Sequence, residues 1–558
     1  MEGEVSQRSF RRRLGGPDFL YGVEVVTSRG VAPAEGVAGP AALARALLAD
    51  ERIGWISITD NAGGGPMLPP DWLAQHVADQ RHRVVVHLTC KDRNRNALEA
   101  ALWRYASEGF CNILALTGDY PTAGFRGLPT PVFDLDSVGL IAMARAMNDG
   151  LESPDRRGRL SRLPPTDFFI GCTVSPFKRH ERELMPQYFK LVRKIAAGAR
   201  WVIPQLGYDM RKFHEVKLVL ASRGLDVPVV GNVYLLSRGV ARMFHSGKLA
   251  GCVVSDALLA EAERQAESPD KGKAFFEELA AKQLAVFEGL GFAAGYLGGV
   301  ADVETVGRIL DRVRSFAPDD WRQFLKEIQY SQPDEFFLFE HDAETGMSDP
   351  SRVNREYLAS LRRPPRSREV TLGYRLSRLV HRWFFTRDRG VWALMVRLYR
   401  RWDSRPGWLS RAAYAVERAS KATLYGCVDC GDCSLPDCAY LCPRHACSKN
   451  GRNGPCGGSA SGRCELDDKE CFWARVYERL KHYGETEGMF DGPITFYNAA
   501  LEHTSSWANT YLDRDHHAPP KAQAPPADRP ETPKPAGLAP EGPAPRNQKP
   551  DEPSTPRD

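Results

Sequence analysis

Residues 84–89 read Val-Val-Val-His-Leu-Thr, a helical pattern covers residues 97–106, and Asn-Ile-Leu-Ala-Leu follows at 112–116. Both apolar runs are short and aliphatic, which is typical of strands that are buried on both faces. Because a helical pattern separates them, we expect the two strands to be parallel neighbours in a β-α-β unit. This stretch predicts an α/β fold on a parallel sheet.

The same alternation recurs from about residue 19 to about residue 315. Helical patterns such as those at 97–106 and 188–197 separate eight strand candidates, at 19–26, 55–59, 84–89, 112–116, 168–174, 201–206, 228–235 and 294–298. Eight such units match a TIM (β/α)8 barrel. A doubly wound open sheet is the alternative, but no G-x-G-x-x-G follows the first strand, which counts against a dinucleotide-binding sheet.

Length and composition place the chain among ordinary globular proteins of more than one domain. It has 558 residues, of which 42% are hydrophobic and 26% charged, and its net charge of +5 is small. We therefore expect no nucleic-acid partner. No apolar stretch of signal-peptide length follows Arg11–Arg13, and the apolar segment 391–396 is too short to span a bilayer. These features favour a cytoplasmic protein with no membrane span.

Composition shifts divide the chain into five predicted regions. These are an N-terminal extension (1–18), the barrel (19–325), a charged and Pro-rich linker (326–370), a helical cysteine-rich metal-binding domain (371–515) and a Pro-rich tail (516–558). The tail has too few apolar residues to offset the entropy of ordering, so we expect it to be disordered.

One amphipathic helix is expected at the start of the fourth region. Its apolar face carries Leu372, Leu376, Leu379, Val380 and Trp383. Arginines between these residues would also suit a helix on a membrane surface. We favour a helix that packs the second domain onto the first.

Polar residues end most of the predicted strands, where a TIM barrel carries its active site. They are Glu24, Thr59, Asp60, His87, Thr89, Asp119, Ser175 and Gln205. Glu24 lies in an apolar strand, where burial would raise its pKa and make it a candidate general acid. A salt bridge inside the barrel is the alternative for Glu24, and a helix N-cap is the alternative for Asp119. Together these residues predict a site at the carboxyl ends of the strands.

Five motifs resemble the methylenetetrahydrofolate reductase family. They are Trp-Ile-Ser-Ile-Thr-Asp at 55–60, Val-His-Leu-Thr-Cys at 86–90, Leu-Ala-Leu-Thr-Gly-Asp-Tyr-Pro at 114–121, Arg-Lys-Ile-Ala-Ala-Gly-Ala at 193–199 and Gln205 on the next strand. Each motif is weak alone, but all five occur in the family's order and spacing. The resemblance covers about residues 19–315.

This resemblance implies an FAD-containing oxidoreductase that converts 5,10-methylenetetrahydrofolate to 5-methyltetrahydrofolate in one-carbon and methionine metabolism. By motif match, Glu24 is similar to the general acid, and Asp119 to the carboxylate beside flavin and pterin that stabilises the developing cation. Gln205 resembles the pterin-binding glutamine. The flavin contacts implied by the resemblance are Thr59, His87, Asp119 and Lys194.

Three departures from the family pattern leave the electron donor open. Val-Val-Thr-Ser follows Glu24 where the family commonly has two aromatics and two prolines, and Thr117 stands where an Arg often precedes Gly-Asp. The loop at 175–180 also differs. The donor is therefore NAD(P)H or a ferredoxin-like protein, and the sequence does not decide between a monomer and a homo-oligomer.

Nine of the thirteen cysteines lie between Cys427 and Cys471. In an intracellular chain such crowding favours a metal over disulfides. C-x2-C-x2-C with a later Cys-Pro resembles a ferredoxin pattern, whereas a four-thiolate zinc site also begins with C-x2-C. Nine cysteines can fill two four-thiolate sites with one left over. The candidate ligands, for which we favour an iron–sulfur cluster over zinc, are Cys427, Cys430, Cys433, Cys442, Cys447, Cys456, Cys464 and Cys471.

The cysteine-rich segment also resembles the C-terminal domain, or separate partner subunit, found with some bacterial and archaeal methylenetetrahydrofolate reductases. The glycines at 454, 457 and 458 would let backbone N–H groups approach the sulfurs. The other four cysteines (Cys90, Cys111, Cys172 and Cys252) lie in apolar, strand-like settings, and we expect them to be buried.

Two rival functions remain at this stage. A pterin-dependent methyltransferase would also use a TIM barrel, but the implied flavin contacts argue against it. A non-catalytic, redox-responsive module would need neither Glu24 nor Asp119, and both are present.

Overall fold

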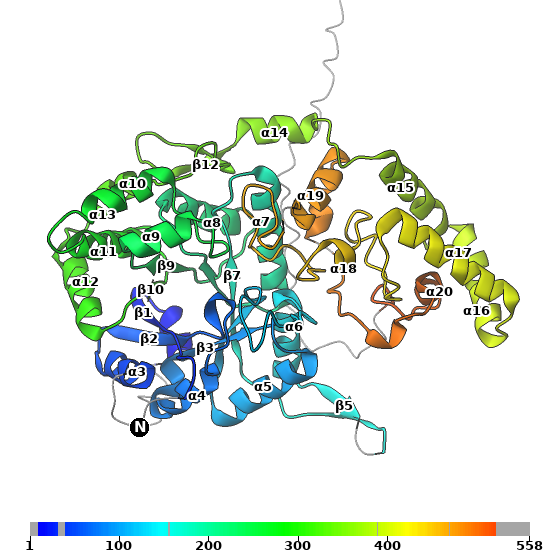
Figure 1. Ribbon diagram of the computed structural model, residues 1–558, viewed down its shortest axis with the longest axis horizontal. Helices are drawn as coiled ribbons and strands as arrows, with labels where there is room; N and C mark the ends of the chain where they lie inside the picture. Colours follow the sequence, from blue (N-terminus) through cyan, green and yellow to red (C-terminus); the bar gives the residue numbers. More distant parts are fainter. Residues whose placement is uncertain are drawn as a thin grey trace, which may run out of the picture.

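A computed structural model describes residues 9–31, 39–154, 157–387, 389–467, 469–490 and 492–519. Its main feature is an eight-stranded parallel sheet (Figure 1). The strands are β1 (Leu20–Val25), β2 (Ile53–Ile58), β3 (Val84–Thr89), β4 (Asn112–Leu116), β7 (Phe169–Val174), β8 (Trp201–Pro204), β9 (Val230–Tyr234) and β10 (Ala294–Gly298). Their order is β8-β7-β4-β3-β2-β1-β10-β9, and a parallel bridge from Val202 to Val229 links the two outer strands. The predicted TIM-like α/β barrel is confirmed.

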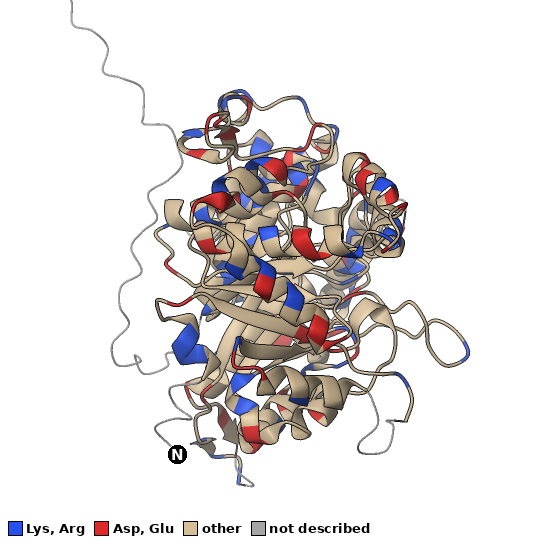
Figure 2. Cartoon of the chain, turned by 90° about the vertical axis from the view of Figure 1, so that its left-hand side faces the viewer, with Lys and Arg blue, Asp and Glu red and all other residues tan. Residues whose placement is uncertain are grey.

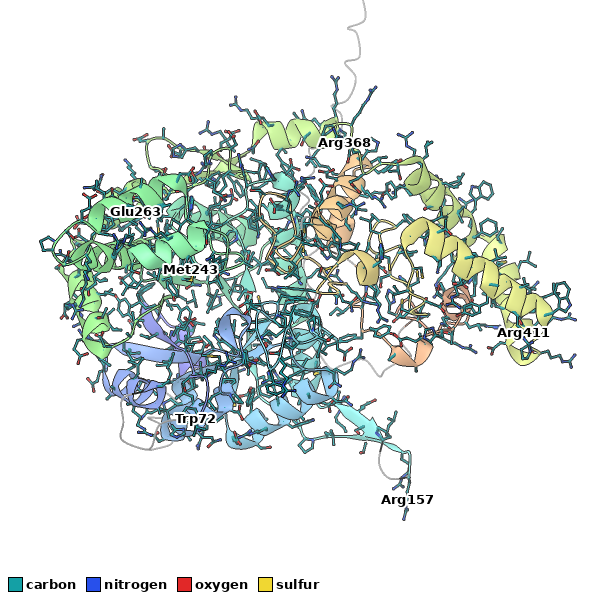
Figure 3. All side chains as sticks on the ribbon, in the orientation of Figure 1. Trp72, Arg157, Met243, Glu263, Arg368 and Arg411 are labelled. Carbon is teal, nitrogen blue, oxygen red and sulfur yellow. The ribbon has the colours of Figure 1, made fainter. Side chains whose placement is uncertain are left out.

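Helices cover the outside of this barrel. They are α3 (Pro40–Ala49), α4 (Pro70–Gln75), α5 (Arg95–Glu108), α6 (Ser137–Asn148), α7 (Glu181–Ala197), α8 (Met210–Ser222), α9 (Arg238–His245), α10 (Asp256–Gln265), α11 (Lys273–Gly289), α12 (Val303–Ser315) and α13 (Asp320–Glu327). A hairpin of β5 (Glu152–Pro154) and β6 (Leu160–Arg162) extends outward, with Arg157 at its far end in Figure 3. Lys and Arg are interspersed with Asp and Glu over the barrel side in Figure 2.

Large aromatic side chains fill the interior of the barrel. Trp55 and Trp201 are fully buried there, and Phe10 of the short helix α2 (Phe10–Leu14) contacts both, with ring centroids at 4.8 and 5.2 Å. A Cβ at Gly22 would lie 2.1 Å from the Trp55 ring, so only glycine leaves room for this indole. This aromatic packing closes one end of the barrel. The open end therefore lies at the carboxyl ends of the strands.

The segment between the barrel and the cysteine-rich region has secondary structure of its own. It contains β11 (Phe339–His341), β12 (Ser348–Val353) and α14 (Arg355–Arg362). The buried Glu215 of α8 accepts hydrogen bonds from the backbone N–H groups of Leu338 (2.6 Å) and Phe339 (3.2 Å). These bonds hold the segment, predicted only as a linker, against the barrel.

The second part of the chain is helical. Its helices are α15 (Leu372–Phe384), α16 (Gly390–Ser404), α17 (Trp408–Tyr425), α18 (Pro443–Ala446), α19 (Phe472–His482) and α20 (Ser506–Tyr511). This part also has two 3-10 turns, η3 (Thr486–Met489) and η4 (Ala499–Leu501), and the barrel has two more, η1 (Ala62–Gly64) and η2 (Ala78–Arg83). Helix α19 packs on α7, where the Tyr477 hydroxyl donates to Glu181 Oε1 at 2.6 Å. In Figure 1, α19 lies between the barrel and the outer helices α15–α17.

The apolar face of α15 does not pack the second domain onto the first, so that interpretation was wrong. Leu372 is 81% exposed and Trp383 54% exposed. Figure 1 shows α15 on the far side of the cysteine-rich loops from the barrel. No described helix is both long and apolar enough to cross a membrane. Most of the predicted tail, residues 520–558, lies outside the described residues.

Candidate active site and cysteine clusters

Glu24 lies near the carboxyl end of β1, beside Tyr296 of β10. The Tyr296 hydroxyl donates a hydrogen bond to Glu24 Oε2 at 3.1 Å. Burial raises the pKa of Glu24, and this hydrogen bond opposes the rise because it stabilises the carboxylate. Within the described residues Glu24 has no ion-pair partner, so no salt bridge holds it ionised. The carboxyl group can therefore hold a proton that solvent-exposed glutamates have lost.

Asp119 follows β4 at the same end of the barrel. Gly118 adopts a φ of +92°, and its Cβ position lies 3.0 Å from the Thr89 Cβ, so the turn requires glycine. The backbone N–H of Gly63 donates to Asp119 Oδ2 at 3.1 Å. Asp119 is not a helix N-cap, because the next described helix along the chain, α6, has Asp136 as its N-cap. The tight turn instead holds this carboxylate at the end of the strand.

The structure brings Glu24 and Asp119 into one electrostatic environment around Cys252. Burial raises the pKa of the Cys252 thiol to about 12, and the neighbouring carboxyl groups of Asp119 and Glu24 add to the rise. Tyr234 of β9 also lies beside Glu24, because a Cβ at Gly298 would contact both side chains. The two predicted catalytic carboxyl groups thus share the mouth of the barrel.

Thr59 and His87 are buried at the ends of β2 and β3. The Thr59 hydroxyl is buried and has no hydrogen-bond partner among the described residues. His87 Nε2 pairs with the Ser57 hydroxyl, and burial lowers the pKa of His87 to about 4, which keeps the imidazole neutral. A buried hydroxyl without a partner is costly, and a bound polar ligand would satisfy it.

Asp60, by contrast, has its hydrogen bonds satisfied inside the protein. Its Oδ2 accepts from the backbone N–H of Thr89 at 2.9 Å, from the Thr89 hydroxyl at 2.8 Å and from Arg93 Nη1 at 2.7 Å. These bonds connect the ends of β2 and β3, which is a structural role.

Lys194 is not brought together with these residues. It is buried on α7, and its Nζ donates to the backbone carbonyl of Thr173 in β7 at 2.6 Å. Burial also lowers its pKa to about 8. Within the protein, Lys194 therefore connects α7 to β7.

Gln205 and Ser175, after β8 and β7, contact a loop of the cysteine-rich region. A Cβ at Gly457 would lie 2.8 Å from Ser175 Oγ, and one at Gly251 would lie 3.2 Å from Gln205 Nε2 and 3.4 Å from the Gly457 carbonyl. The buried Lys178 donates from Nζ to the carbonyls of Gly457 and Ser459. This loop therefore forms part of the barrel mouth.

A second contact comes from Lys449. Its Nζ donates to the carbonyl of Gly118 at 3.0 Å and pairs with Glu465. Burial alone would lower the pKa of Lys449, but the neighbouring Cys456, Glu465 and Asp119 outweigh burial and raise it. Lys449 thus joins the second domain to the turn that carries Asp119.

Eight of the nine clustered cysteines fall into two sets. In the first set, burial raises the pKa of Cys442 to about 11 and the neighbouring Cys433, Cys430 and Cys427 raise it further. The Asp429 N–H donates to Cys427 Sγ at 3.4 Å, and Lys421 Nζ donates to Cys433 Sγ at 3.5 Å. These donors stabilise thiolates.

The second set includes Cys456, which directly precedes the loop held by Lys178 of the barrel. Burial raises the pKa of Cys471 to about 12, and the neighbouring Cys456 and Cys447 raise it further. Burial also raises the pKa of Cys464, and Cys456 adds to that rise. The N–H groups of Gly451 and Gly458 donate to Cys447 Sγ and Cys456 Sγ, each at 3.4 Å. The expected approach of glycine N–H groups to sulfur is confirmed at Gly458.

Cys438 belongs to neither set. It is fully buried, and burial raises the pKa of its thiol. Cys442 of the first set and Cys447 of the second both add to this rise, so Cys438 lies near both sets. All thirteen cysteines lie among the described residues and each thiol is free. Of the four scattered cysteines, Cys90, Cys172 and Cys252 are buried as expected, and Cys111 is half-buried.

Sequence reasoning missed several residues of the mouth. Tyr296 lies within a predicted strand, and its polar hydroxyl in an apolar run was an available signal. Cys252, Lys178 and Lys449 had no such signal, because each acts through a contact that only the fold creates.

Comparison with known proteins identifies both parts of the chain. Residues 24–285 match the family model described as methylenetetrahydrofolate reductase, and residues 408–497 match the one described as methylene-tetrahydrofolate reductase C terminal. The chain belongs to the methylenetetrahydrofolate reductase family. The Glu24 and Asp119 region and all eight candidate cysteine ligands lie within these matched residues of the family.

Curated relatives of this family match about a third of this chain or less. The 5,10-methylenetetrahydrofolate reductase of Salmonella typhimurium is 26% identical over 152 residues, which cover 27% of this chain and 43% of the relative. Methylenetetrahydrofolate reductase 2 of Saccharomyces cerevisiae is 27% identical over 186 residues, covering 32% of this chain and 28% of the relative. The chain thus spans less than half the length of these relatives.

A solved structure from Clostridium thermocellum, described as an uncharacterized protein that binds two copies of 5-methyl-5,6,7,8-tetrahydrofolic acid, also matches. The identity is 11% and the TM-score 0.36, over 56% of this chain and 96% of that chain.

Proposed function

We propose that this protein is a flavin-dependent oxidoreductase that reduces 5,10-methylenetetrahydrofolate to 5-methyltetrahydrofolate. The observation that carries the proposal is the placement of Glu24 near the carboxyl end of β1 and Asp119 after β4 at the same mouth of the barrel, in a chain of this family. Glu24 has a raised pKa and no ion-pair partner among the described residues, which suits a proton donor. Asp119 remains available to stabilise positive charge on the substrate.

The acid–base work falls to these two residues. Because Tyr296 donates to Oε2 of Glu24, the proton resides on Oε1, the oxygen closest to Gly298. Glu24 would give that proton to the leaving nitrogen as the five-membered ring opens to an iminium ion. Asp119 would stabilise this cation, and Gln205 would hold the pterin through an amide that both donates and accepts. Hydride addition to the methylene carbon then gives the methyl product.

FAD fits the residues at the mouth. The unpartnered Thr59 hydroxyl offers a donor and an acceptor, and the neutral His87 imidazole lies on the neighbouring strand. When bound, the flavin would supply the hydride. The loop held by Lys178 would exclude water from this end of the barrel. A pyrophosphate contact from Lys194 remains a prediction.

For the cysteine sets we favour iron–sulfur clusters over zinc. A zinc ion at 2.3 Å from four sulfurs would hold them about 3.8 Å apart. Among the described residues, no three cysteine sulfurs lie within 4.8 Å of one another. In a cluster each thiolate binds a different iron, so the sulfurs stay farther apart, and N–H donors to sulfur are typical of such sites. The backbone N–H donors to Cys427, Cys447 and Cys456 support the cluster.

A ferredoxin-like electron donor is favoured over NAD(P)H by the charge of the outer helices. Residues 372–425 contain twelve Lys and Arg but three Asp and Glu. Arg411 lies at the outer end of α17, far from the barrel, in Figure 3. A basic surface beside the first cysteine set would attract an acidic redox protein. Electrons would then pass through the second set, at Cys456, to the mouth.

One anaerobic preparation tests the proposal. We expect a yellow-brown protein that releases FAD on heating, contains iron, and forms 5-methyltetrahydrofolate when reduced. A colourless protein that transfers the methyl group instead would support the methyltransferase. Bound flavin without folate turnover would support the redox-responsive module.

A further inference from the structure

A second polar cluster lies beyond the cysteine sets, at the end of the described chain. The Nε2 atoms of His516 and His517 both point to Asp437, at 3.0 Å from Oδ2 and 2.9 Å from Oδ1. One ligand atom from each of these three residues lies within 4.8 Å of the other two. Two imidazoles and one carboxylate that converge in this way match the ligands of many mononuclear metal sites.

The outer nitrogens of both rings are held by further carboxylates. His516 Nδ1 bonds to Asp432 Oδ1, and His517 Nδ1 lies 3.6 Å from Asp515 Oδ2. Metal-binding histidines almost always donate their second N–H to such a partner, which fixes the tautomer and raises ligand basicity. Here each ring has its own carboxylate at Nδ1, so both Nε2 atoms are directed to the carboxylate of Asp437.

The charge of the cluster also favours a cation. Three carboxylates, of Asp432, Asp437 and Asp515, surround two imidazoles. Asp432 is 1% exposed, and its Oδ2 has no hydrogen-bond partner in the part of the chain that the structure describes. Even with both imidazoles protonated, the three carboxylates leave one negative charge in a largely buried place, which a divalent cation would offset.

An ion can reach the cluster from outside. Asp437 and His517 line a cavity of about 1080 Å³ between α15, α17 and the first cysteine set. Its wall also includes His381, Tyr440 and Leu376. Three protein ligands beside a cavity leave coordination positions for water or another small ligand.

We propose that Asp437, His516 and His517 bind one divalent transition-metal ion of the Zn²⁺ or Fe²⁺ class, separate from the cysteine sets. Both histidines lie beyond residues 408–497, where the C-terminal family model matches. Asp432 stands between Cys430 and Cys433, and the histidines follow α20. The ion would therefore fasten the chain after α20 to the loop that carries the first cysteine set.

The test uses the full chain, purified anaerobically with its cysteine sites loaded, and titrated with Co²⁺. We expect one equivalent to bind with visible d–d absorption and without the thiolate-to-cobalt charge-transfer band of cysteine ligation. H517Q should bind at least 10-fold more weakly. Asp515→Asn removes only an outer carboxylate and should weaken binding about 10- to 100-fold.

His245→Gln is the matched control, because His245 pairs with Asp256 at 2.8 Å on the barrel surface. It should bind Co²⁺ as the wild type does. Cobalt bound only with a charge-transfer band, or no binding to the wild type at all, would overturn the proposal and leave a histidine–aspartate ion-pair network. Because these two outcomes concern the wild type, a variant that fails to fold does not obscure the result.

Discussion

Glu24 is the residue on which the proposed chemistry depends most. Glu24→Gln keeps the shape of the side chain and removes the proton. We expect flavin and folate binding within about twofold of wild type and a fall in kcat of about 10²- to 10⁴-fold, the usual contribution of a general acid. Steady-state turnover and flavin titration measure both. The control is Glu263→Gln on the outer surface (Figure 3), which should turn over normally. Near-normal turnover in Glu24→Gln would place the acid elsewhere.

The hydrogen bond from Tyr296 gives a prediction about pH. A general acid works in its protonated form, so kcat should fall as pH rises through the raised pKa of Glu24. Tyr296→Phe removes a donor that stabilises the carboxylate, which moves this pKa higher still. The fall in kcat should therefore move to higher pH in the variant. A kcat–pH profile of both proteins decides, and a shift to lower pH would contradict the assignment.

The turn after β4 decides where Asp119 stands, and it depends on one glycine. Gly118 has a φ of +92°, and an added Cβ would lie 3.0 Å from Thr89 Cβ and 3.2 Å from Lys91 Cβ. Gly118→Ala should lower the free energy of unfolding by about 2 kcal/mol or more and reduce turnover. Gly65→Ala, which meets nothing within 4 Å, should change stability by less than about 0.5 kcal/mol. Denaturant unfolding compares the two, and equal stabilities would show that the turn tolerates a side chain.

The loop at 457–459 forms part of the mouth through Lys178. Lys178→Met keeps the aliphatic stem but leaves the carbonyls of Gly457 and Ser459 without their donor. Each unsatisfied carbonyl costs about 1–3 kcal/mol, so the melting temperature should fall and amides 456–460 should exchange faster. Hydrogen exchange with mass spectrometry measures this. Lys248→Met on the exposed surface should change neither, and unchanged exchange in Lys178→Met would mean that other contacts hold the loop.

Elements of the barrel were predictable from the sequence because their signals are local. Every predicted strand matches an observed one to within two residues at each end, since most of these apolar runs have a polar residue or glycine on at least one side. The face of α15 was misjudged because amphipathic spacing shows that one side is apolar but not what covers it. Leu376, for example, borders the cavity instead of the barrel.

At the scale of the whole molecule, the contacts that join the two parts could not be predicted. Lys449 reaches the carbonyl of Gly118 across 331 positions of sequence, and Lys178 reaches Gly457 across 279. Neither residue stands out in its own segment, because a lysine among cysteines or in a loop usually faces solvent. The site residues Glu24 and Asp119 were found from strand position, whereas their enclosure by the second domain follows only from the fold.

The arrangement of the two cysteine sets leads to the last prediction, on how electrons reach the barrel. Cys430 belongs to the first set and Cys438, which is fully buried, to neither. If the sets hold iron–sulfur clusters, Cys430→Ala should lose about half of the iron and nearly all turnover driven by a reduced ferredoxin-like protein. Dye-linked oxidation of 5-methyltetrahydrofolate should continue, because it needs only the flavin and the barrel residues.

Cys438→Ala is the matched control, since it removes a thiol from the same region without removing a proposed ligand. It should keep its iron and its ferredoxin-driven turnover, with only the modest loss of stability expected from a small buried cavity. If the sets instead hold zinc, Cys430→Ala should unfold the second domain, because structural zinc binding is coupled to folding. Stoichiometric zinc without iron in anaerobic wild-type protein would then exclude the second domain as an electron path and leave NAD(P)H as the donor to the flavin.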